Sequence, residues 1–332
     1  ITRYERDADF VDPGNLPVFI IIVCSGPKIS QESSFHRQME HVSVLLKSAA
    51  SQTKTVLRFL VVTDSLAAYL NVLAIPSSWP LEYRRKVRLE HRDVWYPPDR
   101  EAMKSLLRPC SSARLFLPEI ITDLDSAVLI DTDTLFLRPP EALLMEIYNF
   151  NDKQAAGLAQ TSMGLNHRNI PFPGPRGVNT GVMVMNLTRL RALPGGWTGT
   201  TLSAFDNYRN RLGITATNDI VNIALAQNPA ILYDLDCVWN FGPGVCWRGT
   251  NHCPAAEEFG ASLVHGTSAS FVNTRNKKFR ALYEGWRDHP VNGSLSDLYE
   301  AVTEKISMDT SRKIRCNKVK RLPFILTEGL RR

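Results

Sequence analysis

No apolar run in this chain of 332 residues approaches the ~20 residues that a membrane-spanning helix requires. The longest apolar run extends only from Pro17 to Cys24. The sequence as it stands therefore predicts a soluble protein. Because it begins at Ile1 and not at a methionine, we expect an N-terminal anchor or signal to lie outside it.

Signatures of several other protein classes are also missing. The six cysteines form no Cys-x-x-Cys pair, which argues against a structural zinc site. No Gly-x-x-x-x-Gly-Lys loop occurs, which disfavours a nucleotidyl or phosphoryl transferase. Apolar residues make up 44% of the chain and charged residues 22%, so a packed core is expected and wholesale disorder is excluded.

The basic excess is small and uneven. The net charge of +6 comes from 39 basic and 33 acidic residues, and eight of the basic residues lie between Arg312 and Arg332. That stretch holds one aromatic residue, Phe324, whereas nucleic-acid-binding surfaces combine basic residues with stacking aromatics. We therefore expect a solvated basic extension over 291–332 and no nucleic-acid partner. A contact with a polyanion or an acidic partner is the minor alternative.

The even cysteine count and two glycosylation sequons favour the secretory pathway. The sequons begin at Asn186 and Asn292, and Asn186 is expected to be the more buried of the two. The pairing of the cysteines stays open, although Cys237, Cys246 and Cys253 are close enough in sequence for one local disulfide.

The hydrophobic pattern alternates between strand-like and helix-like segments. Apolar or alternating runs predict strands over 18–24, 55–62, 81–91, 127–130, 155–160 and 180–186. Helices are predicted over 31–51, 101–122, 200–212, 219–227 and 278–287. This alternation predicts an α/β domain with a largely parallel sheet over 17–290, preceded by a leader or stem remnant over 1–16.

The most informative motif is Asp131-Thr132-Asp133, which directly follows the apolar run 127–130. Side chains two residues apart in an extended segment point the same way. Two carboxylates so placed repel each other unless a cation lies between them, and oxygen ligands suit Mn²⁺ or Mg²⁺. Open α/β sheets also bind ligands at the carboxyl ends of their strands. A polar turn is the alternative, since Asp is a common turn residue.

Four segments around this motif together resemble the metal-dependent, glycogenin-like glycosyltransferases (glycosyltransferase family 8). In the family's order they are Leu115–Ile120, Leu129–Leu137, Gly177–Leu187 and Leu263–Gly266. Three further segments look most similar to the animal glucoside xylosyltransferases: Leu107–Pro118, Cys237–Asn240 and Lys278–Glu284. The resemblance implies a GT-A fold and a retaining, Mn²⁺-dependent transfer of xylose from UDP-xylose to O-linked glucose on EGF-like repeats, such as those of Notch. It also implies a type II membrane protein of the Golgi or ER lumen.

The resemblance assigns roles by position. Asp131, Asp133 and His265 would bind the metal. The remaining donor-binding residues would be Val23, Cys24, Ser25, Lys104, Arg114, Thr132, Gly266 and Arg275. Val23–Ser25 would receive the nucleoside, and Lys104 and Arg114 would bind the diphosphate, with solvated helix charges as the alternative for both. Arg275 would lie on a loop that closes over the donor, in place of the lysine that this family carries after His-Gly.

The catalytic positions carry one departure from the family pattern. Asn179, Asn218 and Asp219 would contact the donor sugar. In the family's Gly-Asp-Gln-Asp motif, however, Thr217 replaces the first carboxylate and Asn218 replaces the Gln, while Asp219 matches the last Asp. A turn residue is the alternative for Asn179, and a helix N-cap for Asp219. The missing carboxylate keeps two other functions open: a transferase for UDP-glucose or another UDP-sugar, and a weakened donor- or glycan-binding relative.

Overall fold

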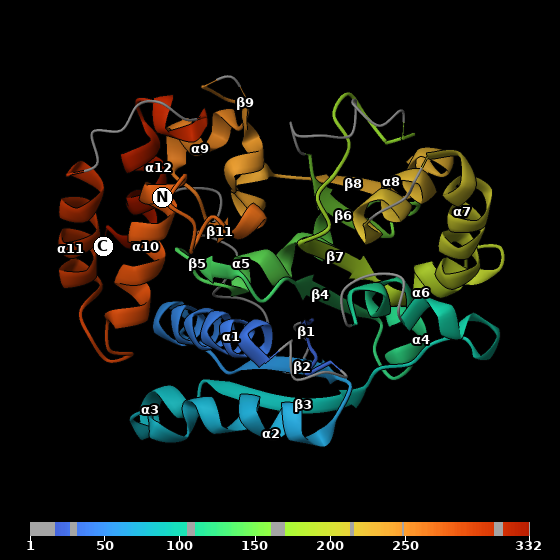
Figure 1. The fold of residues 1–332 in the computed structure, drawn as a ribbon, viewed down its shortest axis with the longest axis horizontal. Helices are drawn as coiled ribbons and strands as arrows, with labels where there is room; N and C mark the ends of the chain where they lie inside the picture. The colour runs from blue at the N-terminus through green and yellow to red at the C-terminus, as the bar shows by residue number, and fades with distance from the viewer. Residues whose placement is uncertain are drawn as a thin grey trace.

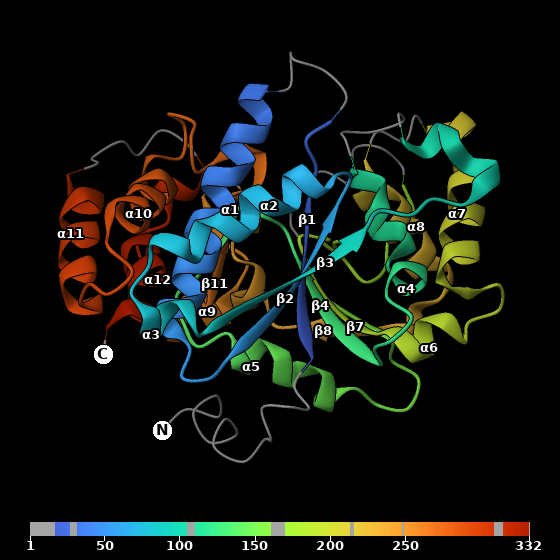
Figure 2. The ribbon, with the colours of Figure 1, turned by 90° about the horizontal axis from the view of Figure 1, so that it is seen from below.

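A seven-stranded sheet forms the centre of the computed structural model (Figures 1 and 2). The structure describes residues 17–26, 32–104, 110–160, 170–212, 216–247, 249–308 and 315–331. The sheet has the order β3-β2-β1-β4-β7-β6-β8. The strands are β1 (Val18–Val23), β2 (Leu57–Thr63), β3 (Val87–Asp93), β4 (Ser126–Ile130), β6 (Ala156–Ala159), β7 (Val182–Asn186) and β8 (Leu232–Leu235).

Strand direction places the carboxyl ends of β1, β2 and β4 at one edge of the sheet. The strands from β3 to β4 are parallel, β7 is antiparallel to both β4 and β6, and β8 is parallel to β6. The predicted α/β architecture with a mixed, largely parallel sheet is therefore confirmed.

Strand β1 is buried on both faces, as an unbroken apolar run in a parallel sheet requires. Phe19, Ile21 and Val23 belong to one hydrophobic cluster, and Val18 and Ile20 to another on the opposite face. Because successive side chains alternate across a strand, this single segment joins the two halves of the core.

Helices cover both faces of the sheet (Figure 1). One group contains α1 (Glu32–Gln52), α9 (Pro254–Phe259), α10 (Lys277–Asp288), α11 (Leu295–Ser307) and α12 (Leu322–Thr327). The other contains α4 (Leu117–Ile120), α6 (Leu187–Arg191), α7 (Gly196–Leu212) and α8 (Thr217–Gln227). The remaining helices are α2 (Leu66–Ala74), α3 (Leu81–Arg84) and α5 (Glu141–Leu144). None of the described helices is long and apolar enough to span a bilayer.

Two predicted elements differ from the observed ones. The strand predicted over 81–91 begins only at Val87, because Pro80 precedes the helical turn α3. The helix predicted over 101–122 is a series of short turns, Pro98–Lys104, Ser111–Phe116 and α4, with 105–109 outside the described residues. Pro118 lies in the first turn of α4, where its missing N–H costs nothing, so a new helix starts there.

The expectation of a solvated C-terminal extension is wrong for the described residues beyond 290. Helix α11 buries Leu298, Val302 and Ile306, whose spacing of four places them on one face. That face packs on α10, where a side chain at Gly285 would collide with Val302. The composition of 291–332 does not reveal these apolar residues, because most of its basic residues lie beyond α11, between Arg312 and Arg332.

Three disulfides reinforce the fold. Cys237 and Cys253 form the predicted local bridge. Cys24–Cys110 links the end of β1 to the turn before α4, and Cys246–Cys316 ties the C-terminal region to the body of the domain. The second and third bridges close loops of 86 and 70 residues, so no local pattern in the sequence could identify them.

Candidate metal and donor site

Asp131 and Asp133 lie where β4 ends, and backbone hydrogen bonds fix both residues. The N–H of Asp131 donates to the carbonyl of Gly181 at 2.7 Å, which extends the pairing of β4 with β7. The carbonyl of Asp133 accepts from the N–H of Gly266 at 2.6 Å. These hydrogen bonds tie the motif to the Asn-Thr-Gly turn through Gly181 and to the His-Gly turn through Gly266.

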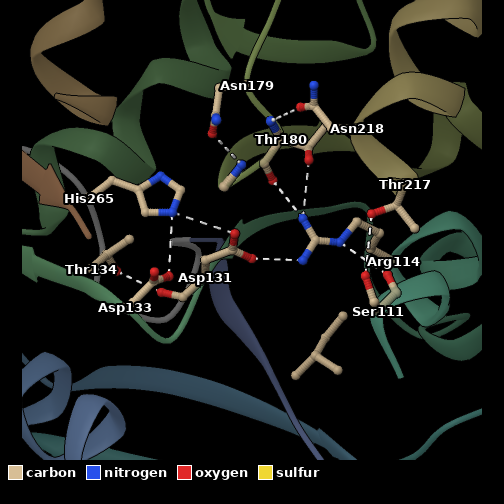
Figure 3. Close-up of polar contacts among 12 residues, drawn as sticks. Ser111, Arg114, Asp131, Asp133, Thr134, Asn179, Thr180, Thr217, Asn218 and His265 are labelled. Carbon is tan, nitrogen blue, oxygen red and sulfur yellow. Dashed lines mark hydrogen bonds and ion pairs between the residues drawn. The ribbon is translucent and has the colours of Figure 1, made fainter. Parts of the chain in front are cut away.

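His265 completes the cluster, although it lies far from both carboxylates in the sequence. It ends β11 (Leu263–His265), which pairs antiparallel with β5 (Thr134–Phe136) directly after the carboxylates. Its Nε2 lies 3.4 Å from Asp133 Oδ1 and 3.6 Å from Asp131 Oδ2 (Figure 3). Gly181 makes room for the ring, since a Cβ there would lie 1.9 Å from His265 Cε1.

These three side chains fit a divalent cation. One ligand atom from each of Asp131, Asp133 and His265 lies within 4.8 Å of the others. The carboxylate oxygens are hard ligands of the kind that suits Mn²⁺ and Mg²⁺, and a neutral imidazole is a common metal ligand. The predicted ligand residues thus converge in space, although they come from two distant segments.

The electrostatics of the cluster agree with a cation site. Burial alone would raise the pKa of the Asp133 carboxyl, but the charge and hydrogen bond of His265 lower it to about 2. Burial likewise opposes the charged form of His265, yet the carboxylates of Asp133 and Asp131 outweigh it and raise its pKa. The two carboxylates therefore attract positive charge to the position between them.

Arg114 holds Asp131 from the opposite side. Its Nη2 donates to Asp131 Oδ1 at 2.8 Å, and its Nη1 donates to the carbonyl and hydroxyl oxygens of Thr180 at 3.2 and 3.1 Å. Its Nε donates to the carbonyl of Ser111. With its side chain only 14% exposed, Arg114 is not the solvated charge of the alternative interpretation. Its predicted contact with the diphosphate stays a prediction.

The Asn-Thr-Gly turn joins the metal cluster to α8. Asn179 Oδ1 accepts from the N–H of Gly181 at 2.9 Å, so the turn role considered for this asparagine is real. Asn218 Oδ1 accepts from the N–H of Thr180 at 3.0 Å (Figure 3). Asp219 is 2% exposed in the first turn of α8, whose N-cap is Ala216, so the N-cap interpretation of Asp219 is wrong.

Comparison with known proteins identifies relatives of this chain. The chain is 36% identical over 279 residues to mouse glucoside xylosyltransferase 2, and 34% identical over 275 residues to the Xenopus laevis protein of that name. Each alignment covers 78% of this chain. The chain is a homologue of the glucoside xylosyltransferases. It spans 61% and 64% of the length of these two relatives.

The fold of this glucoside xylosyltransferase homologue is GT-A. Among solved structures, the apo form of mouse xyloside xylosyltransferase 1 superposes with a TM-score of 0.55 at 18% identity. That superposition covers 76% of this chain and 98% of the mouse chain. No protein-family model matches the sequence.

The other residues that the resemblance assigned to the donor lie in varied settings. Val23 is buried in the core, and the Cys24 side chain is bonded to Cys110, so their backbones are what a nucleoside can contact. Ser25 follows them at the carboxyl end of β1, and its N–H donates to Asp64 at 3.0 Å. Thr132 lies between the two metal-site carboxylates.

Lys104 and Arg275 lie on the surface. Both side chains are exposed, and Lys104 Nζ lies 5.7 Å from the ring centroid of Tyr96. Arg275 precedes α10, in the segment that follows Gly266. Their contacts with a donor stay predictions.

Sequence reasoning missed two residues of this network. Thr180 lies within the resemblance segment Gly177–Leu187 without an assigned role, yet it contacts both Arg114 and Asn218. Asn240 ends the segment Cys237–Asn240, also without an assigned role, and its Oδ1 lies 2.8 Å from Nδ1 of His265. Asn240 lies 25 residues before His265, so the sequence offers no sign of this contact, and only the folded chain brings the two together.

Proposed function

We propose that this chain transfers xylose from UDP-xylose to a glucose residue of a glycan acceptor. The homology to proteins named glucoside xylosyltransferase supports the reaction. The observation that carries the proposal is the convergence of Asp131, Asp133 and His265 at the carboxyl end of β4. That edge is where open α/β sheets bind their ligands.

In this proposal Asp131, Asp133 and His265 would hold Mn²⁺. The ion would supply Lewis-acid stabilisation to the donor diphosphate. Arg114 keeps one ligand oriented, because three of its hydrogen bonds anchor the guanidinium to Ser111 and Thr180 while the fourth reaches Asp131. Held ligands need no reorganisation when the donor binds, which favours a fast reaction.

The donor sugar would lie beside the first turn of α8. Asn218, Asp219 and Asn179 would contact its hydroxyls, and Asn218 and Asn179 are already tied to the turn that carries Gly181. We assign no carboxylate nucleophile, since Thr217 stands at the departing position. The resemblance implies retention, so we propose a front-face mechanism. The bond between the anomeric carbon and the diphosphate oxygen would break as the acceptor oxygen bonds to the same face of that carbon, and the leaving phosphate oxygen would take the proton of the acceptor hydroxyl.

The acceptor and compartment belong to the same proposal. O-linked glucose on EGF-like repeats would be the acceptor, in the lumen of the Golgi or ER, with a type II anchor outside this sequence. Three disulfides support an oxidising compartment, because such bonds do not persist in the cytosol.

A panel of UDP-sugars tests the donor. We expect UDP release with UDP-xylose and Mn²⁺, and little release with UDP-glucose, UDP-galactose or UDP-N-acetylglucosamine. Preference for UDP-glucose would replace the xylosyl assignment with glucosyl transfer. Tight binding of UDP-xylose without turnover would favour the second candidate, a weakened donor-binding relative, for which Thr217 in place of a carboxylate is the specific support.

A further inference from the structure

Asn240 lies between the metal cluster and the Asn-Thr-Gly turn. It is the last residue of the helical turn Cys237–Asn240 and is 6% exposed. Its Nδ2 donates to the carbonyl oxygen of Asn179 at 3.2 Å and to Asn179 Oδ1 at 3.1 Å. Its Oδ1 lies 2.8 Å from His265 Nδ1. One buried amide thus touches both a proposed metal ligand and a proposed sugar-binding residue.

The orientation of this amide is determined by its neighbours. The carbonyl of Asn179 can only accept a hydrogen bond, and Asn179 Oδ1 is identified as oxygen because the N–H of Gly181 donates to it at 2.9 Å. Two acceptors on one side of Asn240 require the NH₂ group to face them. The reverse orientation would set three oxygens against one another. The oxygen of the Asn240 amide must therefore face His265.

An oxygen facing Nδ1 selects one tautomer of the imidazole. Nδ1 must carry the proton that Asn240 accepts, so the lone pair of the neutral ring is on Nε2. Nε2 is the nitrogen that faces Asp133 and Asp131. We propose that Asn240 is a positioning residue that fixes His265 in the tautomer and orientation that bind the metal. This inference rests on the proposed function of the cluster.

The backbone around Asn240 is held rigidly enough for that role. Trp239 is buried, and its Nε1 donates to Glu146 at 3.2 Å. The N–H of Phe241 donates to the carbonyl of Leu263, and the carbonyl of Phe241 accepts from the N–H of His265 at 2.8 Å. The residues on both sides of Asn240 are therefore anchored, one of them to the strand that carries His265.

Mn²⁺ affinity in the absence of donor tests the inference without any turnover. Electron paramagnetic resonance titration gives the free Mn²⁺ and hence the Kd. Asn240→Leu, which is similar in shape but offers no acceptor, should weaken Mn²⁺ binding by about 10–100-fold, as loss of such outer partners typically does. Asn240→Asp keeps an oxygen acceptor for Nδ1 but loses the two hydrogen bonds that Nδ2 donates to Asn179, so it should weaken Mn²⁺ binding less than Asn240→Leu does.

The control variant Asp133→Asn distinguishes failure of the proposed metal site from failure of the proposed role of Asn240. If it binds Mn²⁺ as tightly as wild type, the proposed metal site itself fails. If Asp133→Asn weakens binding but Asn240→Leu does not, only the role of Asn240 is overturned. Equal weakening by Asn240→Leu and Asn240→Asp would also overturn it, because a packing role does not distinguish an acceptor from its absence.

A measurement on the wild-type protein covers the case in which Asn240→Leu does not fold. In protein with ¹⁵N-labelled histidine and bound diamagnetic Mg²⁺, the ring of His265 should show a protonated Nδ1 and an unprotonated Nε2. Assignment comes from the signal that disappears in His265→Gln. A protonated Nε2 beside an unprotonated Nδ1 would contradict the inference.

Discussion

Arg114 and Asp131 form an ion pair in which Nη2 lies 2.8 Å from Oδ1. The same carboxylate faces His265 through its other oxygen, with 3.6 Å between Asp131 Oδ2 and His265 Nε2. One oxygen of Asp131 is therefore paired with the guanidinium of Arg114, and the other oxygen faces the proposed metal position beside His265. This arrangement makes Arg114 part of the support of the site, whatever it contributes to the diphosphate.

Replacing Arg114 should destabilise the metal-free protein. Arg114→Met removes four hydrogen bonds. The half-buried Asp131 carboxylate loses its ion pair, and the Thr180 carbonyl loses the donor that Arg114 supplied. We expect the free energy of unfolding in EDTA to fall by about 2–3 kcal/mol. Denaturant titration measures it.

The matched control for Arg114 is an exposed ion pair of the same type. Arg92 Nη2 lies 2.7 Å from Asp123 Oδ2, but Asp123 is 57% exposed. Arg92→Met should therefore cost less than about 1 kcal/mol. Equal losses in the two variants would show that the burial of the Arg114 pair contributes nothing.

Thr217→Asp should raise kcat/KM for UDP-xylose about tenfold, the size of one hydrogen bond to a charged group. Thr217 is buried in the first turn of α8, and its hydroxyl lies 3.5 Å from Ser111 Oγ. A carboxylate there restores the family's usual acceptor for donor-sugar hydroxyls. Thr217→Val supplies no carboxylate and should show no gain. The prediction fails if the Asp variant is no better than the Val variant.

Of the two sequons, Asn292 should carry the glycan. Asn292 is exposed in the turn before α11. Asn186 is half-buried at the end of β7, its Oδ1 accepts from the N–H of Arg189, and its own N–H donates to Ala155. In protein secreted from animal cells, Asn292→Gln should abolish the mobility shift on enzymatic deglycosylation, and Asn186→Gln should not. The opposite pattern would contradict the structure.

Glu119 should lower the stability of the protein at neutral pH. Its Oε2 is buried without a hydrogen-bond partner among the described residues. Burial raises the pKa of the Glu119 carboxyl above the ordinary 4.5, and the charge of Arg191 opposes this only in part. The unfolded chain loses this proton first as the pH rises, so the native state is penalised above the raised pKa.

Glu119→Gln should therefore increase the free energy of unfolding at pH 7 and have a smaller effect near pH 4. Denaturant titration at the two pH values measures the difference, with the exposed Glu82→Gln as a control. A benefit that is the same at both pH values would show that the charge is not the cause.

The sequence predicts those elements of the fold whose hydrophobic pattern lies within one short segment of the chain. Strands β1 and β4 are unbroken apolar runs because both faces of a parallel sheet are buried. The strand predicted over 81–91 is wrong for 81–86, because the alternating pattern extends back through the helical turn α3 that Pro80 precedes. The apolar residues Leu298, Val302 and Ile306 are equally local, because their spacing of four is the spacing of one face of a helix.

The candidate site divides in the same way. Asp131 and Asp133 are recognisable because two carboxylates follow a buried strand within three residues. His265 was accessible only through resemblance, since pairing of β11 with β5 brings it there. The contacts of Arg114 with Asp131 and of Asn240 with His265 depend on tertiary approach and side-chain orientation, which no local pattern encodes.

The most direct test of the account is the mass of an acceptor after transfer. A folded EGF-like domain carrying O-linked glucose is incubated with the protein, Mn²⁺ and equal amounts of UDP-xylose and UDP-glucose, and its intact mass is measured. The account predicts the addition of one pentose, which disappears in EDTA and with Asp133→Asn. Addition of a hexose, or pentose transfer that survives both EDTA and Asp133→Asn, would contradict it.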